Sequence, residues 1–155
     1  MDNLNFDPLK LENQLCFPLY AASREVIKTY KPYLDELGLT YTQYIAMILL
    51  WEHKTMTVKE MGNYLMLDSG TLTPLLKKLE DKGLIIRARS TKDERNLNIS
   101  LTDKGIALRA DALGIPEKMG ACCPLTAEES VTLYRLLYKI LGKKDCSDPV
   151  WPFLA

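Results

Sequence analysis

The chain has 155 residues, and its 20 lysines and arginines balance 20 aspartates and glutamates, so the formal net charge is zero. This length fits one domain that buries a core. No uncharged apolar run is long enough to span a bilayer, and the N-terminus lacks the basic start and apolar stretch of a signal peptide. We therefore expect a cytoplasmic protein without a membrane span.

The charge is distributed unevenly along the chain. Residues 1–76 carry a net charge of −3, residues 77–95 carry +3, and the remainder is balanced. Attraction to phosphates depends on the local field, so a basic segment in a neutral protein favours nucleic-acid binding. On charge alone, a solvated charged face is the alternative.

The cysteine and histidine content argues against a metal site. The four cysteines do not form paired Cys-x-x-Cys motifs, and His53 is the only histidine. Zinc sites need such clusters, and hydrolysis by a Cys/His pair is poorly supported because His53 falls at a predicted helix end. We expect no metal, no cofactor and no enzymatic role.

The first predicted helix covers residues 9–34, where apolar residues recur every three or four positions. Pro18 has no amide proton, so the helix either begins near Phe17 or continues with a kink. In the first case Cys16 lies beside the positive helix end, which favours a thiolate. The alternative is a small buried hydrophobe. Helical order is predicted to be lost near Pro32.

Capping residues locate the next two helices. After a turn at Gly38, Thr40 or Thr42 caps a helix. Thr57 and Glu60 form a capping box that opens a short one.

The fourth predicted helix is followed by a hairpin. Asp68 or Ser69 caps the helix, and Gly83 ends it. The apolar period then changes from 3.6 to 2, so "LIIRARS" and "NLNISL" are predicted strands with "STKDER" as the hairpin tip. The helix carries a leucine stripe at positions i, i+3, i+4 and i+7, formed by Leu72, Leu75, Leu76 and Leu79.

Two helices are predicted in the C-terminal part. Thr102 caps the first, which runs to about Leu113, and "PEKMGACCP" is predicted to be a connector. A capping box of Thr126 and Glu129 opens the second, which runs through Leu141. The last residues, "KKDCSDPVWPFLA", are predicted to be an irregular tail.

Two short helices followed by a hairpin form the outline of a winged helix-turn-helix; a generic helical domain with a surface hairpin is the alternative. In the second helix of this motif, the fourth predicted helix of the chain, the leucine stripe faces the core. Small hydroxyls and lysines are left on the outer face, where they suit base edges and phosphates. At the wing tip, Arg95 suits a narrow minor groove and Asp93 could brace it. The predicted DNA-contacting residues are Asp68, Ser69, Thr71, Thr73, Pro74, Lys77, Lys78, Arg87, Arg89, Asp93 and Arg95.

These stretches resemble a known family. "LDSGTLTPLLKKLEDKGLI", with the following "R…DER…ISLT", resembles the MarR family of winged-helix regulators. "LENQLCF", "YKPYLDELGLTY" and "ILLWEHKTMTVKEMG" resemble its organic-hydroperoxide sensor branch, OhrR, and the similarity covers residues 9–142. The resemblance implies a mainly α fold with a small β-hairpin wing. It implies one MarR-type domain over residues 1–155, with dimerisation helices at 9–34 and 102–142, a DNA-binding core at 40–101 and a tail at 143–155.

The resemblance also implies a redox site. The residue that matches the peroxidatic cysteine of the branch is Cys16, and the tyrosines that match the partner subunit's thiolate-stabilising phenols are Tyr30 and Tyr41, with Tyr20 a further candidate. Some members of the branch carry a resolving cysteine near the last helix, for which Cys122 and Cys123 are the candidates here. Cys146 in the tail is a weaker candidate.

The terminal helices carry more apolar surface than one subunit can cover, so we expect a symmetric dimer. The expected function is that of a repressor: the reduced homodimer binds a pseudo-palindromic operator, and organic hydroperoxide oxidises Cys16 to a sulfenic acid and then to an intersubunit disulfide, which releases the DNA. The alternatives are a MarR-type repressor released by a non-covalent ligand, a thiol peroxidase, and a helical interaction protein that does not bind DNA.

Overall fold

The computed structural model describes residues 7–89 and 97–142. The chain forms two compact units, Met1–Ala112 and Leu113–Ala155. The predicted wing tip with Asp93 and Arg95, and the tail with Cys146, lie outside the described residues.

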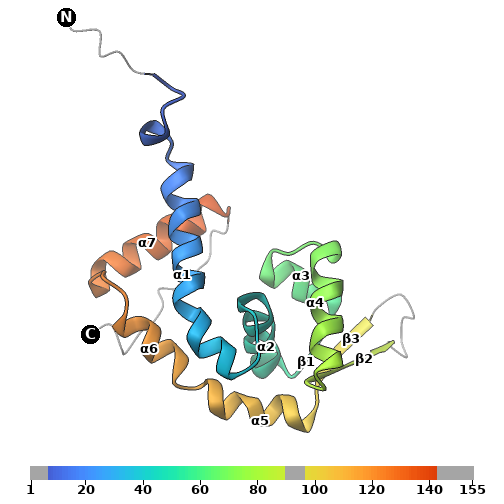
Figure 1. The fold of residues 1–155 in the computed structure, drawn as a ribbon. Coiled ribbons are helices and arrows are strands. Elements are labelled where there is room, and N and C mark those ends of the chain that lie inside the picture. The colour runs from blue at the N-terminus through green and yellow to red at the C-terminus, as the bar shows by residue number, and fades with distance from the viewer. Residues whose placement is uncertain (1–6, 90–96, 143–155) are drawn as a thin grey trace, which may run out of the picture. The chain divides into compact units, whose positions relative to one another are not determined.

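The first unit is a helical unit with a small sheet (Figure 1). One short strand lies between the helices that precede the hairpin, and a last helix follows the hairpin. In chain order its elements are the 3-10 helix η1 (Leu11–Asn13), α1 (Cys16–Glu36), α2 (Tyr41–His53), β1 (Thr55–Thr57), α3 (Val58–Leu65), α4 (Ser69–Asp81), β2 (Ile85–Arg89), β3 (Leu97–Leu101) and α5 (Asp103–Ala112).

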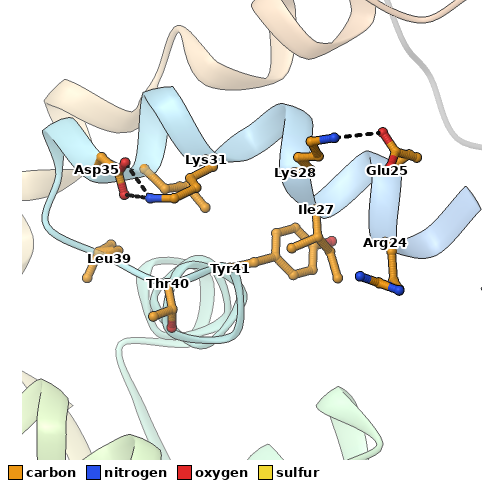
Figure 2. Close-up of a pocket in the computed structure, with 10 residues that line it drawn as sticks. Arg24, Glu25, Ile27, Lys28, Lys31, Asp35, Leu39, Thr40 and Tyr41 are labelled. Carbon is orange, nitrogen blue, oxygen red and sulfur yellow. Dashed lines mark hydrogen bonds and ion pairs between the residues drawn. The ribbon is translucent and has the colours of Figure 1, made fainter. Parts of the chain in front are cut away.

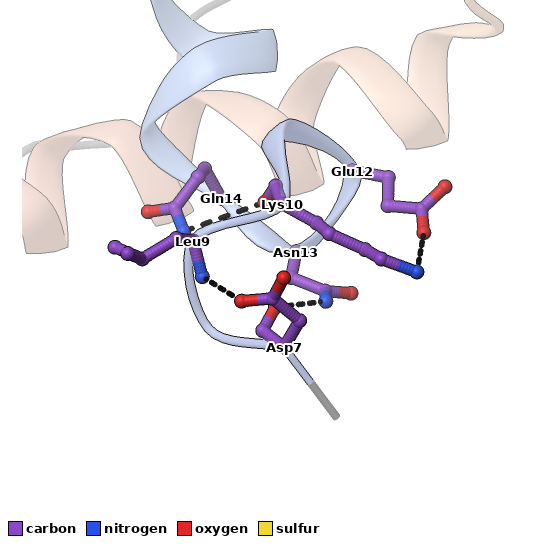
Figure 3. Close-up of polar contacts among 6 residues, drawn as sticks. All are labelled: Asp7, Leu9, Lys10, Glu12, Asn13 and Gln14. Carbon is purple, nitrogen blue, oxygen red and sulfur yellow. Dashed lines mark hydrogen bonds and ion pairs between the residues drawn. The ribbon is translucent and has the colours of Figure 1, made fainter. Parts of the chain in front are cut away.

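The long helix α1 begins at Cys16 rather than at the predicted residue 9. Before it, polar contacts hold a separate turn: the Asp7 carboxylate accepts a hydrogen bond from the Leu9 amide at 2.9 Å, and the Asp7 carbonyl accepts one from Asn13 Nδ2 at 2.7 Å (Figure 3). Pro18 falls in the first turn, where an amide proton has no intrahelical partner, so the helix tolerates it. The interpretation in which the helix starts beside Cys16 is therefore confirmed.

The predicted loss of order near Pro32 is wrong, because α1 continues through this residue to Glu36. Leu34 and Leu39, only 2% and 5% exposed, anchor the end of the helix and the following turn in the core. Burying such side chains contributes about 1.5–3 kcal/mol each, which offsets the hydrogen bond that proline forfeits.

Helix caps follow the sequence signals closely. Thr40, not Thr42, caps α2 in a capping box with Gln43, and Thr57 caps α3 in the predicted box with Glu60. Asp68, not Ser69, caps α4, where its Oδ1 accepts a hydrogen bond from the Thr71 amide at 2.8 Å. The predicted leucine stripe of α4 is buried as expected, and the largest fully buried side chains of this core are Met47, Leu50, Met61, Leu72, Leu76, Leu79, Ile85 and Ile99.

The wing contains one strand more than predicted. The sheet is antiparallel with the order β1-β3-β2, and β1 pairs Met56 with Ile99 of the central strand. On the other side of β3, Ile85 pairs with Leu101. Helix α5 lies very close to the chain just before β2, since a Cβ at Gly105 would stand 2.1 Å from the Leu84 carbonyl oxygen. The wing is thereby fixed to the helical core.

The second unit contains α6 (Ile115–Ala121) and α7 (Ala127–Ile140). The prediction of a connector over "PEKMGACCP" is wrong for its first six residues, because α6 begins just before Pro116, which suits the first turn of a helix, and runs to Ala121. Thr126 and Glu129 form the predicted capping box of α7. Within the described ranges, no helix combines the length and apolar character that crossing a membrane requires.

Candidate DNA-reading surface and redox cysteine

Helix α4 presents a polar surface opposite its buried leucines. We name this surface, defined by the exposed residues Ser69, Thr71, Thr73, Pro74, Lys77 and Lys78, the α4 face. Small hydroxyls allow a close approach at the start of the helix, and the lysines add positive charge one to two turns later. All six are residues that the sequence predicted to contact DNA.

A pocket of about 550 Å³ lies between α3 and the start of α4, and Ser69 and Thr73 line it. Lys59 and Asn63 of α3 line the same pocket, although the sequence did not single them out. Their spacing of four residues places them on one face of α3, and this signal was available in the sequence.

Asp68 and Arg87, two further predicted contacts, are engaged within the protein. Hydrogen bonds from the Thr71 amide and hydroxyl hold the pKa of Asp68 below its ordinary value, as expected for a helix cap. Arg87 on β2 is half-buried and binds Glu80 of α4, with its Nη2 2.6 Å and its Nε 2.8 Å from Oε2. This pair lowers the pKa of Glu80 and joins the wing to the end of α4. Arg89, two residues further, is exposed.

Cys16 is an exposed free cysteine at the first residue of α1. Leu15 caps the helix without a side-chain hydrogen bond, so no side chain of the cap occupies the amides of the first turn. Leu15, Phe17 and Leu19, which are close to Cys16 in the sequence, are themselves exposed, at 80%, 44% and 40%. The thiol therefore lies at the positive end of a helix dipole, on a segment with several exposed apolar side chains.

Three tyrosine rings cluster between α1 and α2. The Tyr30 ring lies 5.0 Å from that of Tyr41 and 5.9 Å from that of Tyr44, centre to centre. Burial, reinforced by the two neighbouring phenols, raises the pKa of Tyr30 to about 12. Burial also raises the pKa of Tyr41 and Tyr44. All three phenols thus stay protonated at neutral pH and can donate hydrogen bonds.

Tyr44 was not among the predicted site residues, although its place three residues after Tyr41 sets both rings on one side of α2. Tyr20 lies apart from this cluster, where its hydroxyl accepts a hydrogen bond from Arg24 at 3.4 Å and the guanidinium lies over its ring.

A pocket of about 550 Å³ opens beside the cluster, and Figure 2 shows the Tyr41 ring extending from α2 toward Ile27 of α1. Its α1 side is charged, with ion pairs between Lys31 and Asp35 at 2.7 Å and between Lys28 and Glu25 at 3.7 Å. The pocket therefore combines the Tyr41 ring and the aliphatic side chains of Ile27, Leu34 and Leu39 with charged side chains of α1.

Cys122 and Cys123 lie directly after α6 in the second unit and are free cysteines. Cys122 is exposed and Cys123 is half-buried. Among the described residues, no group of three or more histidine, cysteine, aspartate or glutamate side chains is arranged to hold a metal ion.

An α3–α4 pair on a three-stranded antiparallel sheet, with an exposed polar face on α4, defines a winged helix-turn-helix protein. Comparison with known proteins agrees. The family model for SarA/Rot transcriptional regulators matches residues 28–111. The chain is 54% identical over 141 residues to the organic hydroperoxide resistance transcriptional regulator of Bacillus subtilis (strain 168), a match that covers 91% of this chain and 95% of that protein.

Two solved structures of AbfR, a Staphylococcus epidermidis protein, are also similar. Reduced AbfR bound to DNA gives a TM-score of 0.73 at 36% identity, covering 85% of this chain and 92% of that one. Disulfide-formed AbfR gives 0.64 at 34% identity, covering 92% and 97%. The chain belongs to the MarR/SarA family of winged-helix transcriptional regulators, which confirms the resemblance found in the sequence. The family is one of regulators rather than of enzymes.

Proposed function

We propose that this regulator is a redox-sensing repressor that acts in the cytoplasm. The reduced homodimer binds a pseudo-palindromic operator, and oxidation of Cys16 by an organic hydroperoxide releases the DNA. The observation that carries the proposal is an exposed thiol at the first residue of α1, in a chain 54% identical to a regulator named for organic hydroperoxide resistance.

The α4 face supports the DNA-binding half of the proposal. In winged helix-turn-helix proteins the second helix of the motif enters the major groove, and here that helix exposes hydroxyls and lysines while its leucines are buried. The related AbfR has been solved bound to DNA. Arg89 at the end of β2 and Arg95, which the sequence predicts in the hairpin tip, are the proposed contacts of the wing.

Exposed apolar side chains support a dimer built from the terminal helices. Leu15, just before α1, and Val26 on α1 are 80% and 49% exposed, and on α7, Leu136 and Ile140 are 53% and 63% exposed. A soluble protein rarely leaves a large apolar surface exposed to water, so such a surface indicates an interface with another chain. A two-fold axis would set the two α4 helices about one DNA turn, roughly 34 Å, apart.

The length of α1 decides which tyrosines can reach Cys16. Tyr30 follows Cys16 by fourteen residues along one continuous helix, a distance of about 21 Å at 1.5 Å per residue. Tyr30, and Tyr41 packed against it, therefore lie beyond hydrogen-bond reach of the thiol in their own chain. In the proposed dimer these phenols come from the partner subunit and donate hydrogen bonds to the Cys16 thiolate.

The proposed chemistry needs a thiolate and a proton source. The Cys16 sulfur attacks one oxygen of the hydroperoxide, the O–O bond breaks, and the departing alkoxide takes a proton to leave as an alcohol. Cys16 is thereby oxidised to a sulfenic acid. A second thiolate then attacks the Cys16 sulfur, and hydroxide leaves as water after protonation, which forms a disulfide.

Replacing both Tyr30 and Tyr41 with phenylalanine is expected to slow oxidation of Cys16 at least about tenfold, because each phenol supplies a preorganised hydrogen bond to the thiolate. The measurement is the rate at which cumene hydroperoxide converts Cys16 to the sulfenic acid, and dimedone, which traps the sulfenic acid, reports its formation. Tyr64→Phe, which removes a phenol on α3, is the control and should react at the wild-type rate. Equal rates for all three proteins would contradict the role of the phenols.

Cys122 and Cys123 are the proposed resolving residues. The relative AbfR has been solved in a disulfide-formed state, which supports a disulfide in the oxidised form of this chain. Cys122→Ser combined with Cys123→Ser is expected to abolish the dimer-sized band that oxidised wild type gives on a non-reducing gel. Each single variant then identifies which of the two thiols resolves. A band that persists in the double variant would assign resolution to another thiol.

A titration of DNA tests the proposed function as a whole. Tight-binding duplexes are first selected from a random pool with reduced protein, and the fluorescence anisotropy of a labelled duplex is then followed. One equivalent of cumene hydroperoxide per subunit is expected to lower the affinity, and dithiothreitol to restore it. A protein that stays bound while its thiols are oxidised would exclude the proposal.

The pocket beside Tyr41 favours one second candidate, a repressor released by a non-covalent aromatic ligand. Such a ligand would release Cys16→Ser and the wild type alike, because it needs no thiol.

A further inference from the structure

The C-terminal end of α4 is held by contacts from three elements. Glu80 binds Arg87 of β2, as described above. The Lys82 carbonyl accepts a hydrogen bond from Lys104 Nζ of α5 at 2.8 Å. The Lys82 ammonium in turn reaches the turn between α1 and α2, where it donates to the Gly38 carbonyl and to Gln43 Oε1.

The Lys82 contact joins both sides of that turn to α4. Gly38 comes two residues after Glu36, the last residue of α1, and adopts the left-handed conformation, with φ at +64°. Gln43, which is 3% exposed, belongs to the first turn of α2, and its Oε1 also accepts the Thr40 amide at 3.1 Å. Lys82 Nζ lies 3.1 Å from Gln43 Oε1 and donates a hydrogen bond to it. One ammonium group therefore connects the end of α4 with the turn between α1 and α2.

Helix α1 is a continuous rod of 21 residues from Cys16 to Glu36. A shift of its start that the helix passes on as one unit displaces its other end, near Gly38. Among the contacts described at the end of α4, the bond of the Lys82 ammonium to Gly38 connects α4 with the end of the helix that carries Cys16. The Glu80–Arg87 pair connects α4 with the wing, and the bond from Lys104 connects it with α5.

We propose that Lys82 is a positioning residue that transmits the displacement of α1 to the reading helix α4 through its bonds to Gly38 and Gln43. This inference rests on the proposed function, since it explains how oxidation at one end of α1 alters the α4 face. It predicts that removing the ammonium uncouples oxidation from release without changing the reaction at Cys16.

The test compares three lysine variants by the ratio of operator dissociation constants in the oxidised and reduced states. Lys82→Met keeps the aliphatic stem but loses both hydrogen bonds, and the exposed Gly38 carbonyl can turn to water. Lys82→Arg retains a donor group. Lys104→Met is the matched control, because it removes one charge and one hydrogen bond at the same helix end but leaves the α1–α2 turn untouched.

We expect the ratio to fall at least about fivefold in Lys82→Met, to stay within about twofold of wild type in Lys104→Met, and to be largely restored in Lys82→Arg. The rate of Cys16 oxidation should be equal in all four proteins, which a general loss of structure would not allow. A wild-type ratio in Lys82→Met, or an equal fall in Lys104→Met, would overturn the inference alone. A wild type that is not released by oxidation would overturn the proposed function and this inference with it.

Discussion

Cys16→Ser is expected to bind the selected operator as tightly as reduced wild type and to stay bound when organic hydroperoxide is added. A serine hydroxyl has nearly the shape of a thiol but does not attack an O–O bond at neutral pH. Because Cys16 is exposed, the substitution opens no cavity and should leave the fold intact. Fluorescence anisotropy with labelled operator measures both states.

The size of the effect follows from what a covalent switch can supply. Allosteric couplings typically change affinity by about 5- to 150-fold, so wild type should weaken by a factor in this range, whereas Cys16→Ser should change less than about twofold. Cys146→Ser changes the cysteine that is the weaker resolving candidate; with Cys122 or Cys123 as the resolving thiol, this comparison variant should be released like wild type. Release of Cys16→Ser by hydroperoxide would instead favour a non-covalent effector.

Reversing the charges of the α4 face with Lys77→Glu and Lys78→Glu should nearly abolish operator binding in the reduced state. If each lysine neutralises one phosphate, the dimer loses four phosphate contacts, so the slope of log affinity against log salt should decrease in magnitude by about 3.6, and affinity near 0.1 M salt should fall at least about 100-fold. Both side chains are exposed on α4, so thermal unfolding should remain close to that of wild type.

The control for this prediction carries the same change in net charge elsewhere. Lys10→Glu with Lys28→Glu replaces two exposed lysines outside the α4 face, at the N-terminal side of the chain. It should lose only a few-fold in affinity through long-range electrostatics, which salt screens. Equal losses in both double variants would mean that net charge, and not the α4 face, governs binding.

Local sequence signals predicted those parts of the fold that depend on neighbouring residues. The capping boxes of Thr57 with Glu60 and of Thr126 with Glu129 are formed as expected, because each needs only a hydroxyl and a carboxylate three residues apart. The leucine stripe likewise predicted correctly which face of α4 is buried.

Features that depend on distant residues were missed. Strand β1 has three residues, too few to show a period, and it exists through its pairing with β3, more than forty residues later. The continuation of α1 past Pro32 depends on burial of Leu34. The contact of Lys82 with Gln43 joins residues 39 positions apart, so no local pattern indicated it.

The most direct test of the central claim follows DNA release and sulfur chemistry in one sample. Operator-bound wild type is mixed with one equivalent of cumene hydroperoxide, anisotropy reports release, and aliquots quenched with dimedone and iodoacetamide are mapped by mass spectrometry. The account predicts that oxidation at Cys16 precedes or accompanies release of the DNA and that both are reversed by dithiothreitol. DNA that leaves while Cys16 is still a reduced thiol would contradict it.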